Sequence, residues 1–89
     1  MKINKNYKQE LLAIFKDMSI YQMAVWVRDH AQFLKWYRNY DDRKIDDVIQ
    51  RYLALGQYMN EHFRNDVEAI NDFKELSIKC VEELEINCR

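Results

Sequence analysis

The sequence has 89 residues, a single glycine, no proline and a formal net charge of −1. Tight turns between strands and phosphate-binding loops depend on glycine or proline, so this composition argues against small β-barrels, β-sandwiches and glycine-cradled nucleotide sites. A charge this close to zero also argues against a polybasic nucleic-acid binder and against an acidic mimic of DNA. We therefore expect a single all-α domain over residues 1–89, folded as a compact bundle of four helices.

The first helix is predicted over residues 6–17, with Asn6 as its capping residue. Its apolar side chains recur at the spacing of one helix face: Tyr7, Leu11, Ile14 or Phe15, and Met18. The second helix is predicted over 20–39, because Ser19 and Gln22 form a capping box before it.

The second helix carries two apolar strips instead of one. The strip predicted to face the core consists of Ile20, Met23, Ala24, Val27, Ala31, Leu34 and Tyr37, and the strip beside it consists of Trp26, Phe33, Trp36 and Tyr40. A helix that is apolar over most of its circumference is buried on several sides. It is therefore either the central helix of the bundle or part of an interface.

Aromatic and arginine side chains are enriched at interface hot spots. On this helix they predict a surface for self-association as a homodimer, or for a protein partner, made of Trp26, Phe33, Trp36, Tyr37, Arg38 and Tyr40. The alternative is that the strip only packs against other helices inside the monomer.

The third helix is predicted over 42–63, where Asp41 and Asp42 place negative charge at its start. Its apolar face is Ile45, Val48 or Ile49, Tyr52, Leu55 or Gly56, Met59 and Phe63. A glycine in the middle of such a face predicts a close approach of two helices, and a local hinge is the alternative.

The fourth helix is predicted over 66–86 with Asn65 at its start, and its apolar stripe is Ile70, Phe73, Ser77, Cys80 and Leu84. The break at 64–66 is the weakest of the predicted boundaries. The alternative is that the last two helices form one long kinked helix.

The acidic residues of the fourth helix lie mainly away from its apolar stripe. Residues 66–86 carry Lys74 and Lys79 against seven acidic residues. Such a face is typical of solvated helix surfaces, and the functional alternative is an acidic face that meets a basic partner, formed by Glu68, Asp72, Glu75, Glu82 and Glu83. Glu85 belongs to the same run of acids, close to the helix end where the dipole disfavours negative charge.

Nucleic-acid binding is the alternative suggested by five cations that occur close together: Arg28, Lys35, Arg38, Arg43 and Lys44. Residues 20–38 resemble a degenerate helix-turn-helix, with Arg28, Asp29 and His30 where the turn would lie. Residues 28–51, which contain the five cations, also hold Asp29, Asp41, Asp42, Asp46 and Asp47, whereas phosphate binding needs uncancelled positive charge.

The sequence contains no arrangement typical of catalysis, and we expect no enzyme activity, no cofactor and no metal. His30 and His62 lie on different predicted helices outside any metal-ligand spacing, and His30 borders a core face, where a hydrogen-bonded structural histidine is expected. Cys80 and Cys88 would lie about 12 Å apart along one helix, too far for a disulfide, so Cys80 is predicted as a core residue and Cys88 as a free thiol.

The longest apolar run, residues 23–27, is far shorter than the ~20 residues of a membrane span, and no apolar stretch follows the lysines near the N-terminus. We therefore expect a cytoplasmic protein without a leader segment. Its size and residue types are typical of the small inhibitors, antitoxins and immunity or anti-defence proteins of bacteria and their phages. The prediction is a non-catalytic regulator that binds protein, and the alternative is a helical DNA-binding transcriptional regulator.

Overall fold

The computed structural model describes residues 5–38 and 42–87, and these form four helices: α1 Lys5–Phe15, α2 Ile20–Arg38, α3 Asp42–Phe63 and α4 Val67–Asn87. The prediction of an all-α four-helix bundle is confirmed. A turn separates α3 from α4, where the Asp66 amide donates a hydrogen bond of 3.0 Å to the Phe63 carbonyl. The alternative of one long kinked helix is therefore wrong.

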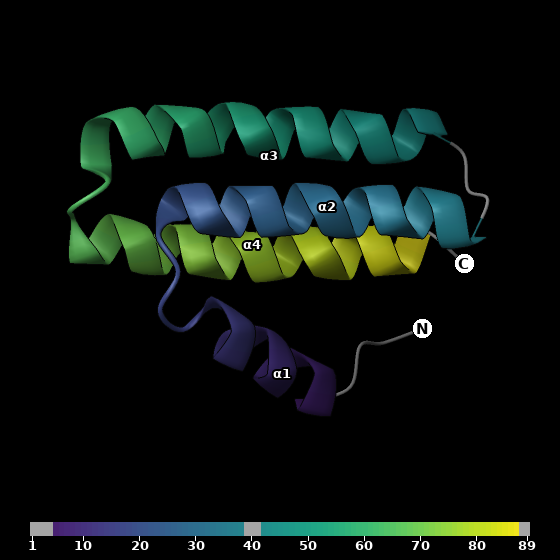
Figure 1. The fold of residues 1–89 in the computed structure, drawn as a ribbon, viewed down its shortest axis with the longest axis horizontal. Helices are drawn as coiled ribbons and strands as arrows, with labels where there is room; N and C mark the ends of the chain where they lie inside the picture. Colours follow the sequence, from purple (N-terminus) through teal and green to yellow (C-terminus); the bar gives the residue numbers. More distant parts are fainter. Residues whose placement is uncertain (1–4, 39–41, 88–89) are drawn as a thin grey trace.

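Three of the helices form the body of the bundle, with α2 and α4 running in one direction and α3 in the opposite one (Figure 1). Each of these three packs against the other two, whereas α1 packs mainly against α4 and crosses it at an angle (Figure 1). One hydrophobic core contains side chains from all four helices.

Side chains rather than glycine or proline mark the helix starts. At α2 the predicted capping box is present, because the Gln22 amide donates to Ser19 Oγ at 3.1 Å and the Ser19 amide donates to Gln22 Oε1 at 2.9 Å. At α4 the cap is Asp66, whose Oδ1 accepts from the Glu68 amide at 3.0 Å and the Ala69 amide at 3.3 Å.

Two predicted caps are wrong. Asn65 lies in the turn before Asp66, and the shorter reach from Asp66 to the free amides of the first turn explains why the aspartate takes this role. Asn6 is not a cap either, since α1 already includes Lys5. Asp41, whose negative charge was predicted to favour the start of α3, lies outside the described residues.

Most positions of the apolar stripes predicted for α1, α3 and α4 form the core. The prediction for Phe63 is wrong, since this last residue of α3 lies where the helix ends and is exposed. On α1 the buried positions are Leu11 and Phe15, while Ile14 is exposed. Of the two residues considered for this face, Phe15 therefore belongs to it and Ile14 does not. On α3 both Val48 and Ile49 are buried. On α4 the buried stripe includes every predicted position from Phe73 to Leu84 and is widened by Ile78 and Val81.

Gly56 lies where α3 approaches two other helices closely. A methyl group added at this position would come within 2.8 Å of Cζ of Phe73 and 3.5 Å of Cβ of Ala24. The ring of Phe73 on α4 therefore occupies the space that any side chain at residue 56 would need. The prediction of a close helix approach is confirmed, and α3 continues as a helix through this residue without a hinge.

Ser77 is the polar residue in the buried stripe of α4, and its hydroxyl is fully hydrogen bonded. Ser77 Oγ donates to the Phe73 carbonyl at 2.7 Å, and Tyr52 donates its phenol proton to Ser77 Oγ at 2.7 Å. A buried hydroxyl without a partner would destabilise the core. These two hydrogen bonds therefore make a serine compatible with this buried position. It also links α3 to α4 near the stacked rings of Tyr52 and Phe73.

Candidate functional site

Three aromatic rings are exposed near the C-terminal end of α2. Phe33, Trp36 and Tyr37 keep 50%, 80% and 66% of their surface accessible to solvent. We call these three residues the aromatic surface. The last turn of α2 extends past the end of α4 (Figure 1), and Trp36 lies on the side of α2 opposite its buried face.

Tyr37 was predicted to face the core, and this prediction is wrong. His30 on α2 pairs with Glu85, which lies two residues before the end of α4 at Asn87. Tyr37 lies seven residues after His30, about 10 Å farther along the helix axis. The neighbouring helix therefore ends before it can bury the Tyr37 ring.

Trp26 belongs to the packed part of the same strip of α2. It is partly buried against the core and meets Phe15 of α1 edge to face at 5.3 Å. From Trp26 the rings continue along α2 as a ladder: Trp26 stacks on His30 at 5.1 Å, His30 on Phe33 at 6.4 Å, and Phe33 on Tyr37 at 5.4 Å. The strip therefore begins in the core and ends in solvent.

Two residues of the predicted surface cannot be placed with the others. The side chain of Arg38 and the whole of Tyr40 lie outside the described residues. The aromatic surface therefore consists of Phe33, Trp36 and Tyr37.

His30 is partly buried and bonded, as the structural interpretation of this residue predicts. Its Nε2 lies 3.1 Å from Oε1 of Glu85, and the side chains of the pair are 18% and 19% exposed. The Tyr7 hydroxyl donates to the same Glu85 oxygen at 3.3 Å. The three residues connect α1, α2 and α4.

Glu85 was predicted with the acids that point away from the core, and this is wrong. It faces α1 and α2 because it lies on the side of α4 that also carries Ile78 and Val81, both buried. Its carboxylate helps to position α1. No local pattern in the sequence signals this role, since it depends on where α1 packs.

The five acidic residues predicted as a partner face do lie on one side of α4. The first four are spaced by four, three and seven residues along the outer face of the helix, and Glu83 borders them. All are exposed except Glu82, which is partly exposed: Glu68, Asp72, Glu75, Glu82 and Glu83. Lys79 lies on the same side. Within the described ranges none of the five carboxylates forms an ion pair. A basic partner for this face stays a prediction.

The cations predicted for nucleic-acid contact are largely engaged with carboxylates. Arg28 pairs with Asp29 at 3.3 Å, and Lys35 of α2 pairs with Asp46 of α3 at 2.9 Å. Arg43 and Lys44 are exposed at the start of α3, and Arg43 also has an interaction partner. The Lys35–Asp46 pair links α2 to α3, the Arg28–Asp29 pair lies within α2, and each pair neutralises one of the predicted cations.

The helix-turn-helix suggested for residues 20–38 is wrong. A single uninterrupted helix covers Ile20–Arg38, and the residues proposed for the turn lie in its middle. The local reason is that Arg28, Asp29 and His30 include no glycine or proline that would break a helix. Residues 20–38 therefore do not form the two helices that this motif requires.

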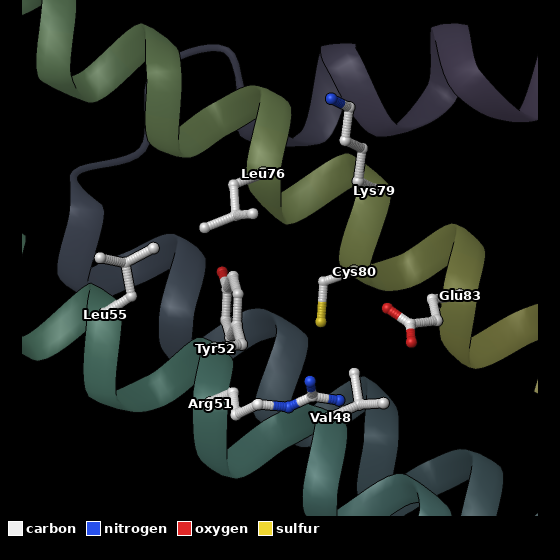
Figure 2. A pocket seen from close by; sticks show the side chains of 8 residues that line it. All are labelled: Val48, Arg51, Tyr52, Leu55, Leu76, Lys79, Cys80 and Glu83. Carbon is white, nitrogen blue, oxygen red and sulfur yellow. The ribbon is translucent and has the colours of Figure 1, made fainter.

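A shallow groove of about 250 Å³ lies between α3 and α4 (Figure 2). Figure 2 shows the Cys80 side chain directed from α4 toward α3, while Lys79 extends away from the groove. The apolar part is formed by Val48, Leu55 and Leu76 with the ring of Tyr52. At its edge, Arg51 is held by Asp47 of its own helix at 3.4 Å.

Cys80 and Tyr52, the two buried ionisable residues of this groove, are held in their neutral forms. Burial, with a smaller contribution from the negative charge of Glu83, raises the pKa of the Cys80 thiol to about 12. Burial also raises the pKa of the Tyr52 phenol, although its bond to Ser77 acts in the opposite direction. A thiol attacks as its thiolate, so this environment suppresses the nucleophilicity of Cys80. Its predicted place in the core is confirmed.

Metal binding has no support in the described part of the chain, where no three His, Cys, Asp or Glu side chains come close enough together to hold an ion. Among the described helices, none is long and apolar enough to cross a membrane. Comparisons with family models, with curated proteins and with solved structures found no match to this chain. Function is therefore inferred from the surface of the molecule itself.

Proposed function

We propose that this chain is a small non-catalytic regulator or inhibitor that acts by binding protein through the aromatic surface of α2. The observation that carries the proposal is the exposure of Phe33, Trp36 and Tyr37 on adjacent turns of one helix. Large aromatic side chains are the residues that contribute most to protein interfaces. Monomeric proteins rarely expose contiguous apolar patches of this kind without a use for them.

The size of the surface is sufficient for binding. Aromatic side chains bury about 150–250 Å² each, so covering the exposed parts of the three rings would remove on the order of 400 Å² from water. At about 25 cal/mol per Å² this is worth about 10 kcal/mol. Association costs about 4–15 kcal/mol in lost freedom of motion, so the rings offset much of this cost and neighbouring contacts decide the affinity.

The ladder from Trp26 to Tyr37 also supports the proposal, because it anchors two of the three exposed rings, Phe33 and Tyr37. Phe33 is stacked between His30 and Tyr37, and His30 is fixed by Glu85. Side chains that are already ordered lose less conformational entropy when a partner covers them. We place the protein in the cytoplasm, where reducing conditions keep a thiol such as Cys80 free.

Site-specific photo-crosslinking in cells tests the proposal without knowledge of the partner. Benzoylphenylalanine is introduced in place of Tyr37, and in a matched control in place of Tyr58, which is 55% exposed on α3 and does not belong to the aromatic surface. We expect discrete protein adducts from position 37 and none of these from position 58.

The absence of adducts from position 37, or the same adducts from both positions, would contradict the proposal. Nucleic acid that copurifies with the protein and is lost on Lys44→Gln would instead favour the DNA-binding alternative, since Lys44 is an exposed cation at the start of α3.

A further inference from the structure

The outer face of α2 carries both a projecting ring and a hollow. Trp36 is the most exposed large apolar side chain of the described residues, with 80% of its surface accessible. Toward the other end of the helix lies a hollow of about 370 Å³, lined by Met18, Tyr21, Gln22, Val25, Trp26, Arg28 and Asp29. A hollow of this volume is within the range of sites that hold ring systems, about 300–1,000 Å³.

The ring and the hollow share one face of the helix. Val25 lies near the middle of the residues that line the hollow, and Trp36 follows it by eleven residues. At 100° per residue, eleven residues bring the side chain back to within about 20° of the same direction, about 16 Å farther along the axis. The exposed residues Tyr21, Gln22, Asp29 and Gln32 occupy the same side, so no described helix covers this face.

We propose that a second copy of this chain is the partner of this face, with the two α2 helices antiparallel and Trp36 of each copy seated in the hollow of the other. The inference rests on the proposed function, because it names the partner for the same surface. A two-fold axis across α2, midway between Val25 and Trp36, brings each ring to the opposite hollow. Such an interface is self-complementary, as two-fold symmetric dimers require.

Symmetry favours a second copy over an unrelated partner of similar size. Each Trp36 contact forms twice in the dimer, whereas the loss of translational and rotational freedom on association is incurred once. Phe33, exposed on the same helix, is turned about 60° away from Trp36 around the helix axis and adds apolar area at the border of this face in both copies. One face of one helix thus supplies both a ring and a hollow.

The polar groups around the hollow suit an indole ring. Arg28 lines the hollow and can lie over the ring face as a cation–π partner. The Asp29 carboxylate is 67% exposed and can accept the indole N–H, while Gln22 is already engaged in the capping box. The apolar floor is provided by Met18, Val25 and Trp26.

Charge does not oppose this association. The charged residues that line the hollow, Arg28 and Asp29, neutralise each other at 3.3 Å. Lys35 is directed to α3, where it pairs with Asp46. The whole chain carries a formal net charge of −1, so two copies repel each other only weakly.

Light scattering on a size-exclusion column at tens of micromolar measures the association. We expect the wild-type chain to elute at twice its mass of 11.0 kDa, and Trp36→Gln to elute as a monomer. Tyr58→Ser removes an exposed aromatic ring elsewhere on the surface and is expected to leave the dimer intact. Circular dichroism of each variant shows that it is folded.

A mixing experiment distinguishes the ring in the hollow from general stickiness. Trp36→Gln keeps the hollow and lacks the ring, whereas Val25→Trp fills the hollow and keeps the ring. Each variant alone is expected to be monomeric. Their mixture can form one of the two contacts, and we expect it to associate more weakly than wild type and at least tenfold more tightly than either variant alone.

Failure of this inference can be told apart from failure of the proposed function. A wild-type monomer that still gives adducts with a different protein from position 37 overturns the dimer and leaves the protein-binding function standing. A monomer without adducts overturns both. A dimer that persists in Trp36→Gln, or a mixture that associates no better than its components, also overturns the proposed arrangement.

Discussion

Tyr52 and Phe73 stack in the core with their ring centroids 5.0 Å apart and their planes at 21°, and Phe33 and Tyr37 stack on α2 at 5.4 Å and 13°. The geometry of the two pairs is similar and their environments are opposite, since Phe73 is fully buried and Tyr37 is 66% exposed. The core pair lies between two helices and has a hydrogen bond to Ser77. The surface pair has helix on one side and water on the other.

Ring stacking therefore does not by itself show what an aromatic pair contributes to the molecule. The free energy of aromatic side chains comes mainly from removal of their surface from water. For Tyr52 and Phe73 this gain is realised during folding. For the aromatic surface of α2 it is still available, and a partner can realise it.

The strongest test of this contrast is Phe73→Ala. We expect the free energy of unfolding to fall by about 3–5 kcal/mol, because the substitution leaves a cavity between α3 and α4 and removes the stacking partner of Tyr52. Urea denaturation followed by circular dichroism measures the loss. A decrease below 1 kcal/mol would show that the core collapses around the missing ring and that the contrast with the surface is weaker than proposed.

Gly56→Ala tests how rigidly the core ring is held. Alanine favours the helix by about 1 kcal/mol, but its methyl group would meet Cζ of Phe73 at 2.8 Å, and overpacking costs about 1–3 kcal/mol. We expect a net destabilisation of about 1 kcal/mol in the same urea assay. Ala54→Gly, at an exposed position of α3, measures the helix preference alone. Gly56→Ala could instead raise the free energy of unfolding by as much as Ala54→Gly lowers it. This result would mean that the Phe73 ring moves aside without cost.

The pH dependence of stability reports the buried groups beside the core pair. Cys80 has a pKa of about 12 in the folded chain and near 9 when exposed, so its neutral form is favoured by folding. Its contribution to stability is complete below pH 9 and is lost between pH 9 and about 12, at about 1 kcal/mol per pH unit. We expect Cys80→Ala to lose less stability than wild type between pH 8 and 10.5. Parallel pH profiles for the two proteins would contradict the raised pKa.

The smallest expected effect on folding is that of Trp36→Gln. Because the ring is 80% exposed, the free energy of unfolding at submicromolar protein should change by less than about 0.5 kcal/mol. At higher protein concentration the wild type should become the more stable of the two, since association stabilises the folded state by mass action. Equal stability at every concentration would count against a partner copy, and a large loss at low concentration would place Trp36 with the core residues.

Much of the fold is predictable because its signals are local. The four helices appear within two residues of the expected boundaries, the Ser19–Gln22 box forms both of its hydrogen bonds, and Gly56 marks the helix contact it predicts. These features depend on backbone geometry and on side chains a few residues apart. The Asn65 and Asn6 errors show the limit, since neighbouring polar residues compete to cap the same amides.

The composition and spacing of this sequence by themselves determined an all-helical chain, the positions of its helices and the stripes that form the core. Only the tertiary structure decided which part of the second apolar strip is covered, because this depends on where α1 packs and where α4 ends. It placed Glu85 inward between Tyr7 and His30, covered part of Trp26 and left Phe33 and Trp36 in water. Local spacing defines the face of a helix to which a side chain belongs, whereas burial depends on neighbours distant in the sequence.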